Sequence, residues 1–323
     1  MDVLITGANG FLGSALCRRL VEGGHRVRAL VRPGSDASAL EGVGVERVPG
    51  DVTDPASVQS AVVGREVVFH LAGVRRAPER AAFFRVNAEG TRTVRDAMLR
   101  AGSRRLVLVG SLAAVGPSEP GRPHVETDPL RPAEWYGESK AEAEQIALGA
   151  AGLEATVARP PRILGPGDRE NLVFFRLVKR GIRLEIGGGP RPLSVVDVDD
   201  VVELLLLLAV RPEAVGEVFF APGPEDTSLE EIQDVGAAEL GVHPRTLRLS
   251  PGRLRALASL ADGFSKLTGR RLPLNRKLAA QLLAPAWTCS GDKARARLGW
   301  TPRMHVRTSI ARSAAWYQAR GWL

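Results

Sequence analysis

The sequence predicts an α/β fold, a doubly wound parallel sheet with a smaller, mostly helical lobe toward the C-terminus. Three observations lead to it. Short, almost continuous apolar runs alternate with helical stretches through the first half of the chain, a glycine-rich turn joins the first run to the first helix, and this alternation stops near residue 165. Continuous apolar runs are typical of parallel strands covered on both faces. Strand–helix alternation implies right-handed crossover units.

The apolar runs give the expected strands in order. They lie at 3–5, 27–31, 45–48, 67–71, 106–109 and 155–158. Between them, residues 11–22 form an expected helix that Gly23 and Gly24 end, and 87–100 form another that Gly102 ends. Glycine is common just past a helix C-terminus because it adopts positive φ without strain.

The second half of the chain predicts how the domains divide. Residues 1–165 are expected to form a dinucleotide-binding domain, and 195–222 to pack back onto it, with 196–210 as a buried helix. The substrate-binding lobe is then 166–194 together with 223–323. In that lobe 186–192 reads as a loop and 250–285 as helix interrupted by Pro and Gly.

Bulk composition excludes several classes of protein. The chain has 323 residues, 44% hydrophobic, with a net charge of +8, yet only five of its basic residues are lysines and the arginines are scattered, so we expect no nucleic-acid partner. No run approaches the ~20 apolar residues of a membrane span, and no signal peptide is evident. Cys17 and Cys289 lack metal-ligand spacing, so we expect no metal and a cytoplasmic protein.

Residues 5–13, "ITGANGFLG", place glycines three apart between the first strand and the first helix. Gly7 permits a tight turn, Gly10 lets the backbone approach a pyrophosphate, and Gly13 lets the helix pack close to the strand. The free N–H groups of the helix then face the phosphates. This context favours a Rossmann-type dinucleotide site over an ordinary turn between a strand and a helix.

The residue after the second strand bears on which cofactor binds. A NAD site usually has an acid there for the ribose, whereas this chain has Arg32, which suits a 2′-phosphate. NADP is therefore the expected cofactor and NAD the alternative. Another reading is that Arg32 is one more arginine of an arginine-rich chain.

Tyr136 and Lys140 lie four residues apart in a segment that reads as a polar helix. The spacing puts both on one helix face. One interpretation is a solvated surface pair. The other is a phenol whose pKa, ordinarily near ~10, is lowered by the ammonium toward the pH at which it would exchange a proton.

A set of motifs occurs in one order along the chain, and any one of them alone is unspecific. They are "TGANGFLG" at 6–13, "GDVTD" at 50–54, "HLAG" at 70–73, "VNAEGT" at 86–91, "GSLAAVGP" at 110–117, "YGESK" at 136–140, "ARPPRILGPGD" at 158–168 and "SGDKARARLGWTP" at 290–302. Together they resemble the extended short-chain dehydrogenase/reductases, the NAD-dependent epimerase/dehydratase type. The likeness is strongest to the branch of 3-beta-hydroxysteroid dehydrogenases and dihydroflavonol reductases.

The resemblance implies roles for particular residues. Ser111, Tyr136 and Lys140 match the family's catalytic triad, and Gly110 departs from relatives that carry a second hydroxyl there. Apart from the resemblance, His124 and Arg75 lie in expected active-site loops and are secondary candidates for substrate contacts, although surface positions are the better prediction for both. The implied cofactor-binding residues are Gly7, Asn9, Gly10, Phe11, Leu12, Gly13, Arg32, Asp51, Val52, Leu71, Ala72, Gly73, Asn87, Tyr136, Lys140, Pro160, Arg162 and Ile163.

Three functions are compatible with these residues. The first is an NADP(H)-dependent oxidoreductase that moves hydride to or from a carbonyl/hydroxyl carbon of a bulky apolar substrate, with Tyr136 as acid/base. The second is a nucleotide-sugar epimerase or dehydratase, in which arginines such as Arg162 grip a diphosphate. The third is a non-catalytic dinucleotide- or RNA-binding relative, which would not need the complete triad.

An apolar stripe in the C-terminal lobe allows two interpretations. Its members at helical spacing are Leu254, Leu257, Leu260, Phe264 and Leu267, and the flanking basic residues are Arg253, Arg255, Lys266, Arg270 and Arg271. Core packing is the first interpretation, and a helix lying on a membrane surface is the second. The resemblance also implies a homodimer, formed by the helices at 87–100 and 136–148.

Overall fold

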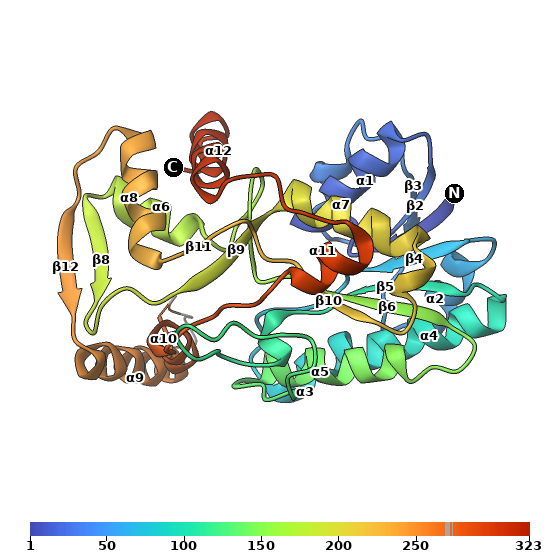
Figure 1. Ribbon diagram of the computed structural model, residues 1–323, viewed down its shortest axis with the longest axis horizontal. Helices are drawn as coiled ribbons and strands as arrows, with labels where there is room; N and C mark the ends of the chain where they lie inside the picture. Colours follow the sequence, from blue (N-terminus) through green and yellow to red (C-terminus); the bar gives the residue numbers. More distant parts are fainter. Residues whose placement is uncertain (269–271, 273) are drawn as a thin grey trace.

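The core of the computed structural model is a parallel sheet of seven strands in the order β10-β6-β5-β4-β1-β2-β3 (Figure 1). The structure describes residues 1–268, 272 and 274–323. Within them the strands are β1 (Asp2–Thr6), β2 (Arg26–Val31), β3 (Glu46–Pro49), β4 (Val67–His70), β5 (Arg105–Val109), β6 (Glu154–Arg159) and β10 (Val218–Phe220). The six strands expected from the apolar runs are confirmed, each within one residue of its expected ends. The order in which strands are added to the sheet reverses between β1 and β4: β2 and β3 follow β1 on one side, and β4, β5 and β6 are added on the other. Parallel sheets of this type bind ligands at that point.

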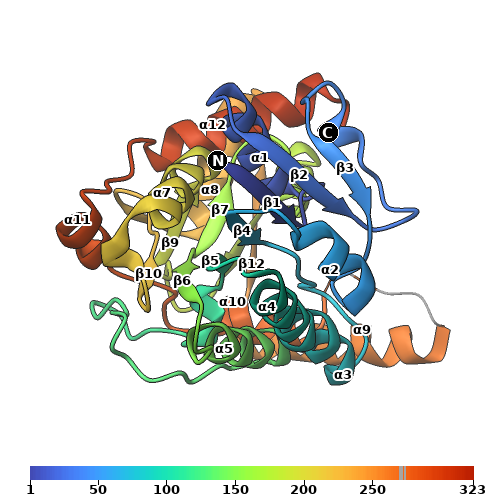
Figure 2. The same ribbon diagram turned by 90° about the vertical axis from the view of Figure 1, so that its right-hand side faces the viewer.

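Helices cover both faces of this sheet, as the continuous apolar strands require (Figures 1 and 2). One face carries α1 (Phe11–Glu22) and α7 (Val198–Val210), whose leucines and valines share a buried cluster with β1 and β4. The other face carries α2 (Pro55–Val62), α4 (Gly90–Ala101) and α5 (Trp135–Leu148), which enclose a second cluster. A short helix α3 (Arg80–Phe84) and a π-helical turn (Arg85–Glu89) lead into α4.

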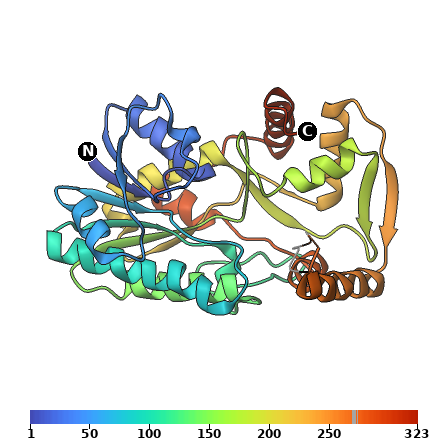
Figure 3. The ribbon, with the colours of Figure 1, turned by 180° about the vertical axis from the view of Figure 1, so that it is seen from behind.

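The second lobe lies beside the carboxyl ends of the strands (Figure 3). Its helices are α6 (Leu172–Lys179), α8 (Leu229–Leu240), α9 (Pro251–Thr268), α10 (Arg276–Leu283) and α12 (Val306–Ala319), and α11 (Asp292–Leu298) contacts β10. Two small sheets join them, which the sequence analysis did not anticipate. They contain β7 (Arg162–Leu164), β9 (Leu193–Asp197) and β11 (Asp226–Thr227), and β8 (Ile182–Ile186) with β12 (Arg245–Leu249).

Two sequence-based expectations need correction. The helix expected at 196–210 begins at Val198, because Asp197 still belongs to β9 and its carboxylate caps the helix by accepting from Asp199 N at 2.9 Å. The expected core packing of the apolar stripe on α9 holds only for Leu254, which is 1% exposed. The helix instead buries its small residues against α10, so the rest of the stripe faces outward: Leu257, Leu260, Phe264 and Leu267 are 44–89% exposed.

The described residues include no helix long and apolar enough to cross a membrane. They also hold no group of three or more His, Cys, Asp or Glu side chains arranged to bind a metal ion. Arg270 and Arg271, and the side chain of Lys266, lie outside the described part of the chain.

Candidate active site

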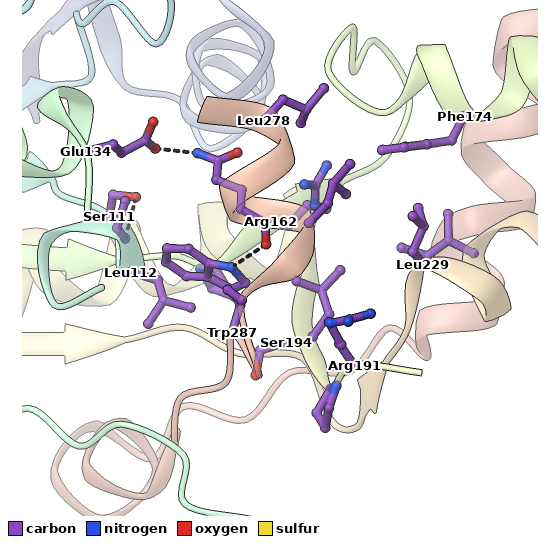
Figure 4. Close-up of a pocket in the computed structure, with 18 of the residues that line it drawn as sticks. Ser111, Leu112, Glu134, Arg162, Phe174, Arg191, Ser194, Leu229, Leu278 and Trp287 are labelled. Atoms are coloured by element: carbon purple, nitrogen blue, oxygen red, sulfur yellow. Dashed lines mark hydrogen bonds between the residues drawn. The ribbon is translucent and has the colours of Figure 1, made fainter. Parts of the chain in front are cut away.

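Two cavities meet at the carboxyl ends of β4 and β5. The first, a long cleft, runs along the glycine loop and ends at Ser111 and Tyr136. The second is a pocket between the sheet and the C-terminal lobe, with an empty volume of about 1050 Å³, open solvent included (Figure 4). Arg75, Ser111 and Tyr136 line both cavities. A group bound in the cleft and a molecule in the pocket would therefore meet at these three side chains.

Two positions of the glycine loop, Gly7 and Gly13, have room for backbone only. At Gly7, whose φ is +69°, a Cβ would lie 2.7 Å from Ala72 N, and at Gly13 it would lie 2.2 Å from the carbonyl oxygen of Gly7. Gly10 is the N-cap residue of α1, and no side chain caps the N–H groups of the first turn. These N–H groups and the positive end of the helix dipole suit a pyrophosphate. The loop therefore fits a dinucleotide.

Loops that come from both lobes enclose the far end of the cleft. Asn9 donates to the carbonyl oxygen of Asp36 at 2.8 Å and to Ser35 Oγ at 3.2 Å, which ties the loop after β2 to the glycine loop. Arg169, in the loop after β7, pairs with the Asp36 carboxylate at 3.5 Å and lies 4.9 Å from the ring centre of Trp322. Trp316, Arg320 and Trp322 line the cleft as well.

Ser111 lies two residues past the last residue of β5, so the end of a buried strand fixes its position. Its Oγ accepts from Ala113 N at 3.1 Å, and its backbone N–H donates to the Glu144 carboxylate at 3.4 Å. The neighbouring Leu112 N donates to the carbonyl oxygen of Pro160 at 3.1 Å. The hydroxyl thus lies at the junction of the two cavities, where it can contact a substrate oxygen.

Tyr136 lies in the first turn of α5 and faces both cavities. Burial raises the pKa of its phenol, whereas the Arg75 guanidinium and the Ser111 hydroxyl lower that pKa. The Arg75 Cζ atom is 5.6 Å from the centre of the tyrosine ring. The phenol therefore keeps its proton at neutral pH, and a cation stands close enough to stabilise the phenolate.

Lys140 is one helical turn further along α5 and 5% exposed. Its Nζ donates to the carbonyl oxygen of Val109, the last residue of β5. Burial lowers the pKa of the ammonium to about 8, and the Glu144 carboxylate opposes that shift. The cation that faces the Tyr136 ring is thus Arg75, while Lys140 lies deeper, beside the end of β5.

Asn87 joins the segment after β4 to helix α5. It is 1% exposed, in the π-helical turn, and its amide holds both backbone groups of Val74, accepting from N at 2.8 Å and donating to O at 3.0 Å. It also donates to Ser139 Oγ of α5 at 2.9 Å. His70 is structural in the same way: it bridges Thr6 and Thr91, and burial lowers its pKa to about 3.

The structure brings most of the proposed site residues to the cleft, but not all. Its lining includes Gly7, Asn9, Gly10, Phe11, Leu12, Gly13, Leu71, Gly73, Ser111, Tyr136, Lys140, Pro160 and Ile163. Arg162 instead lines the pocket, where it donates to Asn171 Oδ1 at 2.6 Å. The side chains of Arg32, Asp51, Val52, Ala72 and Asn87 are outside the lining, and Arg32 is exposed just beyond it. His124 lines neither cavity and is bonded to Asp128 and to the Pro117 carbonyl oxygen.

The pocket is walled mainly by apolar side chains from the C-terminal lobe (Figure 4). From that lobe they are Phe174, Ile186, Leu193, Leu229, Ile232, Leu278, Leu282 and Trp287, and Leu112 adds to them from the segment after β5. Helix α10 closes one side: Gln281 donates to the Glu134 carboxylate, and its carbonyl oxygen accepts from Trp287 Nε1 at 3.2 Å. Through the bond to Glu134, the N-cap residue of α5, helix α10 is tied to the helix that carries Tyr136.

Sequence reasoning missed two parts of the site. Glu144 reads as a surface acid of a polar helix, yet it is 1% exposed and holds Arg159 at 2.7 Å. Glu144 follows Lys140 by four residues on the same helix, and this spacing was the signal that could have identified it as a buried partner. Gln281 and Trp287 carried no signal, because only the folded chain brings the C-terminal lobe to α5.

The comparisons with known proteins agree with this geometry. Residues 3–220 match the model of the NAD dependent epimerase/dehydratase family. The chain belongs to that family. It is thus an enzyme of the extended short-chain dehydrogenase/reductase type, a group that works with a nicotinamide cofactor, which supplies or accepts hydride when bound.

Individual members of the family align over almost the whole chain. The ceramide reductase of Caulobacter vibrioides is 34% identical, over 99% of this chain and 96% of the relative. The 2-alkyl-3-oxoalkanoate reductase of Stenotrophomonas maltophilia is 32% identical, over 98% of this chain and 99% of the relative. The crystal structure of gox2253 superposes with a TM-score of 0.84 at 30% identity, over 99% of this chain and 98% of that one.

Proposed function

We propose that this enzyme is an NADP(H)-dependent oxidoreductase that moves hydride between nicotinamide and a carbonyl/hydroxyl carbon of a bulky, mostly apolar substrate. The observation that carries the proposal is the apolar pocket that opens onto Ser111 and Tyr136. An apolar wall of this kind gains affinity by removing hydrocarbon from water.

In this proposal the three triad residues have separate tasks. Tyr136 gives a proton to the carbonyl oxygen during reduction, a role that suits a phenol whose pKa burial keeps above neutrality. Ser111 hydrogen-bonds the same oxygen as negative charge develops on it. Lys140, whose pKa of about 8 leaves it mostly charged at pH 7, supplies positive charge near the nicotinamide end of the cleft.

NADP(H) is proposed over NAD(H) because of two residues after β2. Arg32 is exposed immediately after the strand and free to reach a 2′-phosphate. The acid nearby, Asp36, is already engaged, since its carboxylate accepts from Ser38 N at 3.0 Å and Oγ at 2.6 Å and pairs with Arg169. Glu41 also lines this end of the cleft, so the proposal depends on the position of Arg32 and not on the absence of an acid.

The names of the relatives support a reductase of hydrophobic carbonyl compounds. One is named a ceramide reductase and the other a 2-alkyl-3-oxoalkanoate reductase. A nucleotide-sugar epimerase or dehydratase remains the alternative. Arg75, Arg162 and Arg191 line the pocket and could bind a diphosphate, but most of the lining is apolar, which favours the first function.

The proposal also covers the oligomeric state, the domain boundary and contact with a membrane. We propose a cytoplasmic homodimer that pairs through α4 and α5, which lie side by side (Figure 1). The domain boundary near residue 165 is proposed as well. The outward stripe of α9, with Arg253 and Arg255 exposed beside it, is proposed to contact a membrane surface.

The deciding experiment is a turnover screen. NADPH oxidation is followed with ketones and aldehydes from small to polycyclic, beside UDP-, GDP- and dTDP-sugars. We expect turnover with long-chain or polycyclic carbonyl compounds and none with nucleotide sugars. Conversion of a nucleotide sugar, with cofactor that copurifies and does not exchange, would replace the proposal by the alternative.

A further inference from the structure

Glu144 is a buried acid on α5 that the triad does not include. It is 1% exposed and lies one helical turn after Lys140. It lines neither the cleft nor the pocket. A substrate or cofactor therefore does not reach this carboxylate, and any effect that it has on the reaction acts through its neighbours.

Glu144 Oε1 faces the backbone at the end of β5. The Ser111 N–H donates to it at 3.4 Å, and a Cβ built on Gly110 would lie 2.2 Å from it. In the same stretch, Lys140 Nζ donates to the carbonyl oxygen of Val109. Two side chains one turn apart on α5 thus hold three successive residues, and the last of these is Ser111, whose side chain lines both cavities.

The other oxygen of the carboxylate binds Arg159, the last residue of β6. Arg159 is 4% exposed, and its Nε and Nη2 atoms lie 2.9 Å and 2.7 Å from the Glu144 carboxylate. Burial raises the pKa of Glu144, and the Arg159 guanidinium lowers it. Because an arginine keeps its proton in proteins, this contact favours the ionised carboxylate and fixes its position from the β6 side.

Lys140 needs a negative charge nearby because its other surroundings disfavour an ammonium. Burial lowers the pKa of Lys140 to about 8, the Glu144 carboxylate raises it, and the Arg75 guanidinium, from the segment after β4, lowers it. His70 of β4 is neutral, since burial lowers its pKa to about 3, and Tyr136 is neutral, since burial raises the pKa of its phenol. The charge that opposes burial and Arg75 is therefore that of Glu144.

We propose that Glu144 is a positioning residue for the reaction: its carboxylate holds Ser111 in place at the end of β5, and its charge balances the buried ammonium of Lys140. The inference rests on the proposed function for the tasks of Ser111 and Lys140, and it adds a residue that contacts neither substrate nor cofactor. One carboxylate thus serves two members of the triad, the first by a hydrogen bond and the second by its charge.

Glu144→Gln tests the role of the charge, because it keeps the length of the side chain and an oxygen that accepts from Ser111 N. The substrate is the carbonyl compound with the highest turnover in the screen. In wild type, kcat/KM should fall as Lys140 loses its proton near pH 8. Glu144→Gln should move the midpoint of this fall about 1 pH unit lower, since an opposite charge nearby favours the charged form by about 1–3 pKa units.

Glu144→Asp tests the role of the hydrogen bond, because it keeps the charge and shortens the arm. The midpoint of the pH profile should stay near that of wild type. The value of kcat at pH 6, where Lys140 is charged, should fall by about 10- to 100-fold, as expected when a catalytic group is displaced by about 1 Å. The two variants should thus change different quantities, whereas a residue that only stabilises the fold would not separate them.

The charge also has a readout that needs no substrate. Unfolding free energy rises with pH between the folded and the unfolded pKa of Lys140, so the rise should begin at lower pH once Glu144 is neutralised. It is measured as the difference between Glu144→Gln and Glu144→Gln/Lys140→Met. This measurement stands even if the turnover screen overturns the proposed function, so the two can fail separately.

A matched control is Glu142→Gln. Glu142 lies two residues earlier on α5 and lines neither cavity, so its loss should leave the midpoint and kcat unchanged. If Glu144→Gln does not fold because Arg159 lacks its anion, Glu144→Leu/Arg159→Met removes both charges and should show the same shift. An unshifted midpoint in the folded variant without the carboxylate, an equal shift in Glu144→Asp, or an unchanged kcat in Glu144→Asp would overturn the inference.

Discussion

The Glu144 carboxylate occupies the space that any side chain at residue 110 would need. A Cβ built on Gly110 would lie 2.2 Å from Glu144 Oε1. That carboxylate is buried, paired with Arg159 and bonded to Ser111 N. The departure from relatives with a hydroxyl at this position therefore has a physical cause, because the chain places a buried acid there instead.

Gly110→Ser should destabilise the fold and displace Ser111, because Glu144 is held by Arg159 and cannot move away freely. Overpacking of this kind costs about 1–3 kcal/mol. The midpoint of urea unfolding measures it. Gly252→Ser is the control, since a Cβ there has no atom within 4 Å. Equal stability of both variants would show that the carboxylate moves aside.

Tyr136→Phe removes the proposed acid/base and keeps the ring that packs at the junction. Loss of general acid–base catalysis lowers turnover by about 10²–10⁴, and we expect that range for kcat. Cofactor affinity, measured by NADPH fluorescence titration, should change little because the glycine loop is intact. A kcat within a few-fold of wild type would remove Tyr136 from the mechanism.

Lys140 predicts a pH dependence whose sign follows from its depressed pKa. Between about 8, its pKa in the folded chain, and the ordinary 10.5, the unfolded chain binds a proton that the folded chain does not. Unfolding free energy therefore rises with pH in this window. Compared with Lys140→Met, wild type should gain stability from pH 8 to pH 10. Parallel stability–pH curves for the two proteins would contradict a lowered pKa for Lys140 in the folded chain.

Two glycine variants separate cofactor binding from folding. At Gly10 a Cβ has only the Gly7 carbonyl oxygen near it, at 3.2 Å, whereas at Gly13 the same oxygen is at 2.2 Å. Gly10→Ala should fold and bind NADP(H) more weakly, because the methyl group enters the pyrophosphate side. Gly13→Ala should lower the melting temperature. Unchanged affinity of folded Gly10→Ala would show that this loop does not hold the phosphates.

Arg32→Asp should reverse the cofactor preference. A charge-assisted bond contributes about 1.5–3 kcal/mol, which is a preference of about 10- to 150-fold for NADP(H), and an aspartate would repel the 2′-phosphate. The measurement is kcat/KM with both cofactors. Arg47→Asp, the same charge change at an exposed position on β3, is the control. A wild-type preference for NAD(H) would favour the epimerase or dehydratase alternative.

The centre of the sheet was predictable because strands β1, β4 and β5 are buried on both faces and each carries its own apolar signal. The glycine loop and the position of Ser111 follow from the same local rules. Gln281 and Trp287 were not predictable as site residues, since their roles depend on contacts between lobes far apart in sequence, whereas Arg75 was named in advance as a secondary candidate. The prediction of core packing for the apolar stripe on α9 was wrong, because helical spacing gives the period of an apolar face but not the direction in which that face points.

The cleft is lined by residues from both ends of the chain, and this affects when the site can form during synthesis. The glycine loop is made early, but Trp316 and Trp322, which help to line the same cleft, follow about 300 residues later. At about 5–20 residues per second, the half-built sheet waits tens of seconds on the ribosome with its dinucleotide site unfinished. We therefore expect tight cofactor binding only after α12 and the residues that follow it have packed against the cleft.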